Sequence, residues 1–524
     1  MRIVINNIAV PIEHKIDDVL FAAQKIARQH LISAENFAVY RQSIDARRKS
    51  NIHYVYSVSA EISEQSFGGR ENISVLKDGS KLNIKKNALS SRPIVAGMGP
   101  CGLFAAYVLT KSGNPPLIIE RGGDVDMRTR AVQNFWNGGG LNLNSNVQFG
   151  EGGAGTFSDG KLNTRKSDPR QRFILETFVH FGAPEDILYR AKPHIGTDEL
   201  KNVLKNMRRF LLNNGCEIRF NTCLTGIGIK DGKVIEAELD GSEAVPCEKL
   251  FLAIGHSSRD TFKMLQKIGI PLEQKPFAAG VRIEHTQEFI GRAQYGDEYK
   301  RLPAADYKLV YNGRDRSCYS FCMCPGGVVV NASSEDGGLV VNGMSNHKRD
   351  GKNANSALVV TVRPEDFESD SPLGGAEFQR RYEELAFRLG GGDYTAPIQL
   401  AEDFVHGRES VSLGSVTPSY TGKTALRDLR RCLPEFITGT LKDGLLNFEH
   451  KMRGFTSGGA VLTGVEMRTS SPVRIIRNEN FECPSAAGLH PIGEGAGYAG
   501  GIMSAALDGL KAAVFATQNY SKNI

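Results

Sequence analysis

The sequence predicts an α/β protein with a doubly wound, Rossmann-like domain at its centre, and two observations favour this fold class. Residues 93–109 read as a short apolar strand, a turn with the spacing Gly97-x-Gly99-x-x-Gly102, and an apolar helix. Glu120 ends the next apolar run, PLIIE, eighteen residues after Gly102. A strand, a glycine turn, a helix and an acidic residue in this order are typical of a domain that binds the pyrophosphate and a ribose of a dinucleotide.

The chain of 524 residues is long enough to form several domains. MRIVINNIAV alternates like a strand, IDDVLFAAQKIARQHLI has helical spacing, and NFAVYRQSIDARR and IHYVYSVSAEI read as two further strands. This order predicts a small α+β domain of ferredoxin-like type. The expected domains are this unit at 1–90, the dinucleotide-binding domain at 91–260 with a glycine-rich insertion at 137–195, a β-rich substrate domain at 261–484, and the last part of the dinucleotide-binding domain at 485–524.

Composition excludes several classes of protein. No run of eighteen apolar residues indicates a membrane span, and the first residues lack the blocks of a signal peptide, so we expect a cytoplasmic protein. The nine cysteines are not spaced as a disulfide framework, which predicts reduced thiols. H-E-x-x-H, paired C-x-x-C and G-x-S-x-G motifs are absent, which argues against metal and acyl-enzyme chemistry. The net charge of +6 suits an anionic ligand as well as a nucleic acid.

Each glycine of the turn has a separate expected role. Gly97 allows the tight turn, Gly99 lets the backbone approach the pyrophosphate, and Gly102 lets the helix pack against the strand. The helix N-terminus offers oriented N–H groups to the phosphates, and Glu120 is placed to bind a ribose diol. The flanking residues expected in the same site are Pro100, Cys101 and Arg121.

Three further segments resemble flavoproteins with two dinucleotide folds. SAAGLHPIGEGAGYAGGIMSAALDGL at 485–510 is similar to their C-terminal flavin fingerprint. LFLAIGHSS resembles their A-T-G motif, with Ile254 in place of threonine, and KDGKV resembles the hairpin of their small β-meander. Together with the first glycine turn, these resemblances imply a resident FAD and not a travelling NAD. No second GxGxxG is present, so we expect no dedicated NAD(P)H domain.

The same resemblances imply which residues surround FAD. A second phosphate-side loop is expected at Gly152, Gly153, Ala154, Gly155 and Thr156. Leu224 and Thr225 stand where the adenine is usually flanked, and Ala253 and Gly255 belong to the middle motif. The residues expected near the ribityl chain and the isoalloxazine are Gly493, Glu494, Gly500, Gly501 and Ile502.

Four phrases resemble a bacterial family usually called uncharacterised FAD-dependent dehydrogenases or oxidoreductases. They are NVQFGEGGAGTFSDGKLNTR (146–165), SFCMCPGG (320–327), NGMSNHKRDGKNANSALVVTV (342–362) and GVEMRTSSPVRI (464–475). The resemblance implies tightly held FAD in a ββα sandwich domain related to hydroxybenzoate hydroxylases and geranylgeranyl reductases. It names no substrate.

The expected function is an FAD-dependent oxidoreductase that moves a hydride or an electron pair between a small organic substrate and an external donor or acceptor. An anionic substrate is one option. One alternative is an NAD(P)H-using reductase of C=C bonds or a monooxygenase-like flavoenzyme. The alternative of another class is a flavin-containing module that binds nucleic acid or a protein through residues 1–90.

Cys322 and Cys324 are the most unusual candidates for chemistry, because an alternating strand would place both on one face. In geranylgeranyl reductase relatives a Y-x-W-x-F-P strand covers the flavin, and residues 319–325 resemble it. This implies that Cys324 lies near the flavin as a proton donor or redox partner. The alternative is that these cysteines only pack as small buried residues.

Residue type makes four arginines candidates for binding a substrate and three histidines candidates for proton transfer. Guanidinium groups bind carboxylates, so an anionic substrate could be held by Arg282, Arg453, Arg468 or Arg474. The alternative for each arginine is that it belongs to a structural ion pair or lies on the surface. Candidates for proton transfer are His194, His256 and His347.

A basic cluster in the N-terminal unit raises the question of nucleic acid. Arg41, Arg47, Arg48 and Lys49 lie near Tyr54 and Tyr56, and basic and aromatic residues on a small sheet can bind RNA. The alternative is a solvated strand face or a domain-docking surface. The expectation is that nucleic acid is not a partner.

Overall fold

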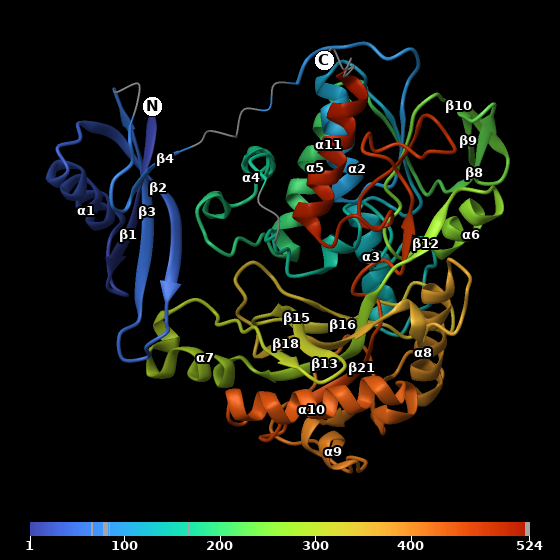
Figure 1. The fold of residues 1–524 in the computed structure, drawn as a ribbon. Coiled ribbons are helices and arrows are strands. Elements are labelled where there is room, and N and C mark those ends of the chain that lie inside the picture. The colour runs from blue at the N-terminus through green and yellow to red at the C-terminus, as the bar shows by residue number, and fades with distance from the viewer. Residues whose placement is uncertain (64–66, 77–81, 83, 165–167, 519–524) are drawn as a thin grey trace.

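The computed structural model describes residues 1–63, 67–76, 82, 84–164 and 168–518. The chain is a mixed α/β protein with several sheets (Figure 1). In this part of the chain no helix is both long enough and apolar enough to cross a bilayer.

The N-terminal unit contains the predicted strand, helix, strand and strand. These are β1 (Arg2–Val10), α1 (Ile16–Gln29), β2 (Ala34–Asp45) and β3 (His53–Ile62), followed by β4 (Ile73–Val75). The sheet order is β2-β3-β1-β4, so β3 lies between β1 and β2 as in a split β-α-β unit. Val19, Ala23 and Ala27 of α1 are buried on this sheet. The unit stands to one side of the rest of the molecule in Figure 1.

A five-stranded parallel sheet forms the centre of the molecule. Its order is β23 (Leu489–Pro491), β11 (Leu250–Leu252), β5 (Ile94–Ala96), β6 (Leu117–Glu120) and β7 (Glu217–Phe220). Because strand side chains alternate, Val95 packs with helices on one face, while Ile94 and Ala96 pack on the other face.

Different layers cover the two faces of the parallel sheet. The helices on the Val95 side are α2 (Pro100–Lys111), α5 (Thr197–Asn213) and α11 (Ile502–Thr517), which lie together in Figure 1. The opposite face packs against the antiparallel meander of β8 (Leu224–Lys230), β9 (Lys233–Leu239) and β10 (Glu243–Pro246). The remaining helices of this part are α3 (Val125–Trp136), α4 (Gln171–His180) and α6 (Arg259–Lys267).

Residues 277–466 contain a seven-stranded mixed sheet. Its order is β14 (Val310–Asn312), β15 (Ser317–Cys324), β18 (Asn353–Val362), β13 (Phe277–Thr286), β21 (Val461–Glu466), β19 (Ala396–Leu400) and β20 (Thr424–Leu426). Two small sheets lie outside it. The sheet of β16 (Val328–Asn331) and β17 (Val341–Met344) packs against β18 and β21, and the sheet of β12 (Leu272–Gln274) and β22 (Val473–Ile475) packs in the core between the central sheet and the meander.

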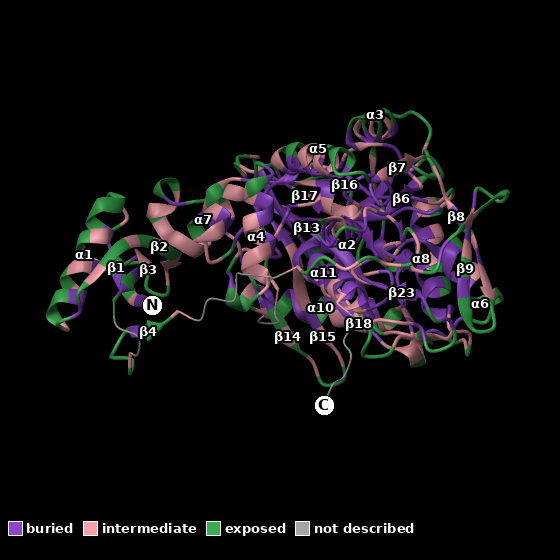
Figure 2. Cartoon of the chain, turned by 90° about the horizontal axis from the view of Figure 1, so that it is seen from above, coloured by how far each residue is buried: buried purple, intermediate pink, exposed green. Residues whose placement is uncertain are grey.

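The region expected to be β-rich also contains helices. These are α7 (Gln287–Tyr295), α8 (Gly374–Gly390), α9 (Ala401–His406) and α10 (Glu435–Lys451), of which α8 and α10 have 17 residues each. Leu441, Leu445 and Phe448 of α10 are buried in the same core as the strands of the seven-stranded sheet. Figure 2 shows that the buried residues are concentrated in the part of the molecule that contains the two large sheets.

Candidate functional site

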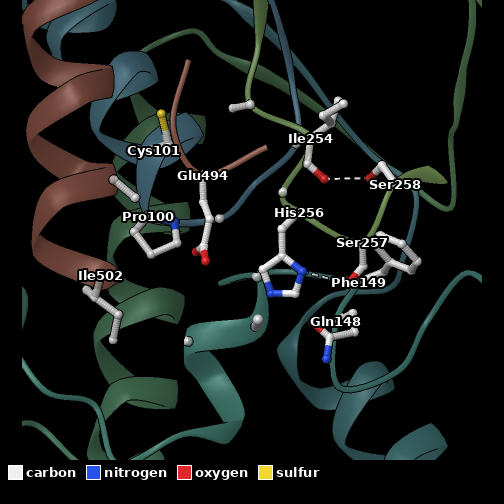
Figure 3. Close-up of a pocket in the computed structure, with 18 of the residues that line it drawn as sticks. Pro100, Cys101, Gln148, Phe149, Ile254, His256, Ser257, Ser258, Glu494 and Ile502 are labelled. Atoms are coloured by element: carbon white, nitrogen blue, oxygen red, sulfur yellow. Dashed lines mark hydrogen bonds between the residues drawn. The ribbon is translucent and has the colours of Figure 1, made fainter. Parts of the chain in front are cut away.

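A cavity of about 360 Å³ lies where the central sheet meets the seven-stranded sheet. Its wall includes the turn between β5 and α2, the end of β6, the loop around 148–163, the end of β11 and the N-terminus of α11. The seven-stranded sheet contributes Cys322 from β15 and Glu466 from β21, and Asn342 comes from β17. Figure 3 shows Pro100, Glu494 and Ile502 around this space.

Glycine is needed at each of the three positions of the turn for a different physical reason. Gly97 has φ +103°, and a Cβ there would collide with the carbonyl group of Ala253. A Cβ at Gly102 would collide with the carbonyl oxygen of Gly97. Gly99 differs, because the nearest atom to its Cβ would be the Cα of Gly153 at 3.6 Å. The fold therefore requires Gly97 and Gly102, whereas Gly99 leaves space at the cavity wall for a ligand.

Glu120 shapes the cavity through backbone groups. Its buried carboxylate accepts hydrogen bonds from the N–H groups of Met98 (2.8 Å), Gly122 (3.0 Å) and Gly150 (2.9 Å). A carboxylate has about four acceptor sites, so one remains for a hydroxyl group. Glu120 thus links the glycine turn to the following loop and still faces the cavity.

The glycine-rich loop is held by Arg128, a residue that sequence reasoning missed. Arg128 is fully buried in α3, and its guanidinium donates to the carbonyl groups of Asn146 (2.8 Å), Val147 (2.8 Å) and Glu151 (2.8 Å). Five N–H groups in a fixed fork can satisfy several loop carbonyls at once. No local pattern marks such a residue, because its partners lie on a loop without periodic structure.

Most of the predicted cofactor residues line the cavity. They are Gly97, Gly99, Pro100, Cys101, Glu120, Arg121, Gly153, Ala154, Gly155, Leu224, Ala253, Gly255, Glu494, Gly500, Gly501 and Ile502. The cavity wall also contains residues that sequence reasoning did not select, among them Asp159, Lys161, Asn342 and Glu466.

The other predicted cofactor residues lie outside the cavity wall. The space for a Cβ at Gly152 is filled by Thr156 and Leu204, and the hydroxyl of Thr156 donates to Glu151 O at 3.1 Å. Gly102 supports the glycine turn, as described above. Gly493 packs against Cys101, and its N–H donates to Asp508 at 2.7 Å. These residues position the loops around the site.

Thr225 has a different environment from its neighbour Leu224. Thr225 is exposed on β8, where its hydroxyl accepts a hydrogen bond from Gly241 N at 2.8 Å. Its side chain closes the meander and does not face the cavity. Of the two residues predicted to flank the adenine, Leu224 lines the cavity and Thr225 does not.

The two candidate cysteines lie at different depths. Cys322 lines the cavity, whereas Cys324 is fully buried and its thiol donates to Cys322 O at 3.3 Å. The expected common face of Cys322 and Cys324 is not found, and Cys322 is the one of the two that lines the cavity, because the strand is irregular at this point. Its pairing with β18 shifts between Phe321 and Cys324, and Cys322 has φ +44°.

Arg282 is not available as a substrate anchor, which corrects the expectation from the sequence. It is 0% exposed, and Nε and NH2 each donate to Glu466 at 2.9 Å. It also donates to Asn355 Oδ1 at 2.7 Å. A guanidinium that is satisfied in this way holds strands together instead of binding a ligand.

Arg468 lines the cavity but is also neutralised. It forms ion pairs with Glu383 (2.7 Å) and Glu335 (2.8 Å), and Arg259 binds the opposite side of Glu383 at 2.8 Å. Burial alone would raise the pKa of Glu383, but the two arginines lower it to about 2. Arg453 is exposed and Arg474 lies over the Tyr498 ring, and neither lines the cavity.

Among the three histidine candidates, His256 alone lines the cavity. Ser257 Oγ lies 2.9 Å from His256 Nδ1, as Figure 3 shows, and burial lowers the pKa of His256 to about 3. His194 and His347 stack on each other, and each hydrogen-bonds a backbone carbonyl. These two histidines join the loop before α5 to the segment after β17.

A cluster of charged residues that the sequence did not indicate lies at the cavity wall. Asp159 is buried, and both Lys161 (2.8 Å) and Arg349 form ion pairs with it. Lys161 and Asp159 both line the cavity, and the Lys161 ammonium also donates to Met323 O. Two cations and one carboxylate give this cluster by itself a net positive charge.

Glu494 carries a testable electrostatic signature. Burial raises the pKa of its carboxyl from 4.5 to about 7, although the Lys275 ammonium favours the charged form. A carboxyl with a raised pKa in the folded state contributes stability at low pH, and this contribution is lost as the pH rises through about 7. We expect Glu494→Gln apoprotein to lose less stability than wild-type apoprotein between about pH 5 and pH 8.

Thermal unfolding of both apoproteins across this pH range measures the effect. Glu479→Gln is the matched control, because Glu479 is exposed in the same C-terminal segment, and it should keep the wild-type pH slope. Equal slopes for wild type and Glu494→Gln would contradict the assignment.

The N-terminal unit contacts the rest of the chain through backbone pairing. Gln42 N donates to Tyr189 O at 2.7 Å, and Ala191 N donates to Gln42 O at 2.8 Å. Tyr56 is 1% exposed and its hydroxyl accepts from Gln42 Nε2, so its ring is not available to stack on a base. Arg47 pairs with Asp45 on the surface.

Comparison with known proteins gives a family. A family model described as "FAD-dependent protein, C-terminal domain-like" matches residues 276–469, and a domain of unknown function matches residues 2–61. An uncharacterized protein of Clostridium beijerinckii is 49% identical over 532 residues, covering 98% of both chains. The chain belongs to the same family as this clostridial protein. The cofactor of the present chain is FAD.

Solved structures with related shapes are more distant. CtdE in complex with FAD is 12% identical, with a TM-score of 0.32, and the match covers 80% of this chain and 83% of that chain. A geranylgeranyl bacteriochlorophyll reductase-like protein from Thermoplasma acidophilum is 12% identical, with a TM-score of 0.33 and coverage of 80% and 76%. The flavin-dependent brominase Bmp2 is 12% identical, with a TM-score of 0.35 and coverage of 82% and 81%.

The residues of the cavity fit FAD. Its volume of about 360 Å³ is within the usual range of ligand sites, roughly 300–1,000 Å³. At Gly99 a Cβ would fill space at the wall that the backbone leaves free, and the N-terminus of α2 offers N–H groups to a pyrophosphate. Glu120 keeps an acceptor site for a ribose hydroxyl, and Glu494 supplies a carboxyl near the N-terminus of α11.

Proposed function

We propose that this protein is an FAD-dependent oxidoreductase that moves a hydride or an electron pair between a small organic substrate and an external donor or acceptor. The observation that carries this proposal is the shared wall of the cavity. The glycine turn after β5 forms one part of it, and Cys322, Asn342 and Glu466 of the 261–484 region form another. A dinucleotide held at the turn is thereby covered by side chains from a second part of the chain.

The bound FAD supplies the hydride and electron chemistry. Gly97, Gly99 and the N-terminus of α2 would hold its pyrophosphate, and Glu120 would accept a hydrogen bond from its ribose. Glu494 and the N-terminus of α11 orient the other half, where a helix N-terminus favours negative charge. We propose that the parallel sheet, the helices on one face and the meander on the other form a Rossmann-like ββα sandwich.

The substrate side favours an anionic or polar molecule for one reason. Arg282 and Arg468 are neutralised by carboxylates, but Lys161, Arg349 and Asp159 together keep a net positive charge. Lys161 reaches the cavity and is the group that would attract a carboxylate or phosphate of the substrate. Cys322 and His256 line the same cavity and are available as polar contacts.

The visible spectrum of freshly purified holoprotein, recorded anaerobically before and after NADPH or NADH, tests the proposal. Bleaching by dithionite is expected for any FAD oxidoreductase. Fast bleaching by a nicotinamide would favour an NAD(P)H-using reductase or monooxygenase-like enzyme. A flavin that stays oxidised with nicotinamides but is bleached by dithionite would favour a dehydrogenase reduced by its own substrate. A flavin that dithionite cannot reduce would contradict the proposal.

A further inference from the structure

The backbone of β15 turns Cys322 toward the cavity. Cys318, four residues earlier, faces α10, where the space for a Cβ at Gly444 is occupied by its thiol. In a regular strand Cys322 would share that face, because side chains repeat every second residue. The pairing with β18 shifts after Phe321, and Cys322 adopts a left-handed backbone that residues other than glycine rarely take. This bulge re-aims the thiol from the core to the cavity wall.

The second thiol lies directly behind the first. Cys324 is 0% exposed, and its Sγ lies against Cys322 and donates to Cys322 O at 3.3 Å. Only Met323 separates the two cysteines in this bulged strand, so their Cα atoms are at most about 7 Å apart, close to the roughly 4.4–6.8 Å range of disulfides. An outer thiol at the cavity and an inner thiol in contact with it are the arrangement of a dithiol couple.

The surroundings separate the protonation of the two sulfurs. The Lys161 ammonium binds Met323 O between the two cysteines, and Arg282 NH1 donates to Cys322 O at 3.3 Å. The neighbouring Cys324 thiol, helped by the Lys161 ammonium, lowers the pKa of Cys322, and the neighbouring Cys322 raises the pKa of Cys324. The nearby carboxylates are Asp159, Glu466 and Glu494. One sulfur is thus a nucleophile and the other keeps its proton.

We propose that Cys322 and Cys324 form a redox-active dithiol that exchanges an electron pair with the FAD in the same cavity. In this step the S–H bond of Cys324 breaks and an S–S bond forms between the two cysteines. The thiolate and the thiol lose two electrons and one proton, and both are passed to the oxidised FAD. The reverse step reduces the disulfide. This inference rests on the proposed function, because it needs FAD to be bound and reducible.

An anaerobic dithionite titration of the air-oxidised holoprotein counts the electrons. Wild type is expected to take up about four electrons per FAD, because the flavin and the disulfide each accept two. Cys322→Ser and Cys324→Ser should each take up about two. Cys318→Ala is the matched control, since this cysteine lies in the same strand but faces α10, and it should keep about four.

Alkylation of wild type provides a second measurement that needs no variant. The tryptic peptide 317–348 holds Cys318, Cys322 and Cys324. After unfolding in N-ethylmaleimide, this peptide should carry one label from oxidised holoprotein and three labels from holoprotein reduced anaerobically by dithionite. Two electrons per FAD together with three labels in the oxidised protein would overturn the dithiol and leave the oxidoreductase intact. A bound flavin that dithionite cannot reduce would overturn both.

Discussion

Replacing Gly99 with valine is expected to abolish tight FAD binding while the apoprotein still folds. The Cβ of residue 99 would meet no protein atom closer than 3.6 Å, but it would fill the space where the pyrophosphate approaches the backbone. We expect FAD affinity to fall by about 100-fold or more, equivalent to about 2.7 kcal/mol. The measurement is the FAD content of purified protein together with a binding titration of the apoprotein.

Two other glycines serve as controls for this variant. Gly439 in α10 is exposed and has no atom within 4 Å of a Cβ, so Gly439→Val should bind FAD like wild type. Gly97→Val should instead lower the stability of the apoprotein, because its φ of +103° is unfavourable for valine and its Cβ would collide with Ala253. A Gly99→Val protein with a full complement of FAD would show that the pyrophosphate is not bound at this turn.

Replacing Arg282 with methionine is expected to destabilise the protein strongly. Removal of the guanidinium leaves Glu466, which is 3% exposed, without its ion-pair partner. Breaking a buried pair from one side costs about 3–5 kcal/mol, which lowers Tm by on the order of 10 °C. Thermal unfolding of the holoprotein measures this effect.

The double variant separates a structural role from a role in substrate binding. Arg282→Met with Glu466→Gln removes both charges and should recover much of the lost stability. Arg292→Met breaks a pair with Glu288 that is more than half exposed on both sides, and it should change stability by about 0–1 kcal/mol. An Arg282→Met protein that unfolds at the wild-type temperature but no longer binds substrate would restore the role of anchor to this residue.

The dinucleotide turn could be predicted because its requirements are local. The positive φ at Gly97 and the close contact at Gly102 can be met by glycine, and these needs lie within six residues of sequence. The helix that starts after Gly501 follows the same logic, since Gly501 has φ +135°. The alternation of Ile94, Val95 and Ala96 likewise divides the two faces of β5.

Helix α8 escaped prediction because its buried face is polar. Gln379 and Glu383 are buried there, Glu383 between Arg259 and Arg468, which interrupts the apolar period that marks a helix. Helix α10 does have the apolar period of a helix, in Ile437, Leu441, Leu445 and Phe448. The sequence therefore contains enough information to predict α10.

The sequence by itself determined the glycine turn at the cavity, and only the tertiary structure decided which charged side chains of the cavity wall are already paired. A glycine turn acts through steric limits between close neighbours, so residue type and spacing are enough to locate it. The availability of an arginine depends on the group that the fold places opposite it. Arg282 meets Glu466 across 184 positions, and Asp159 meets Arg349 across 190. Charges that are paired over such separations, and a bulge that turns Cys322 into the cavity, leave no periodic trace in the chain.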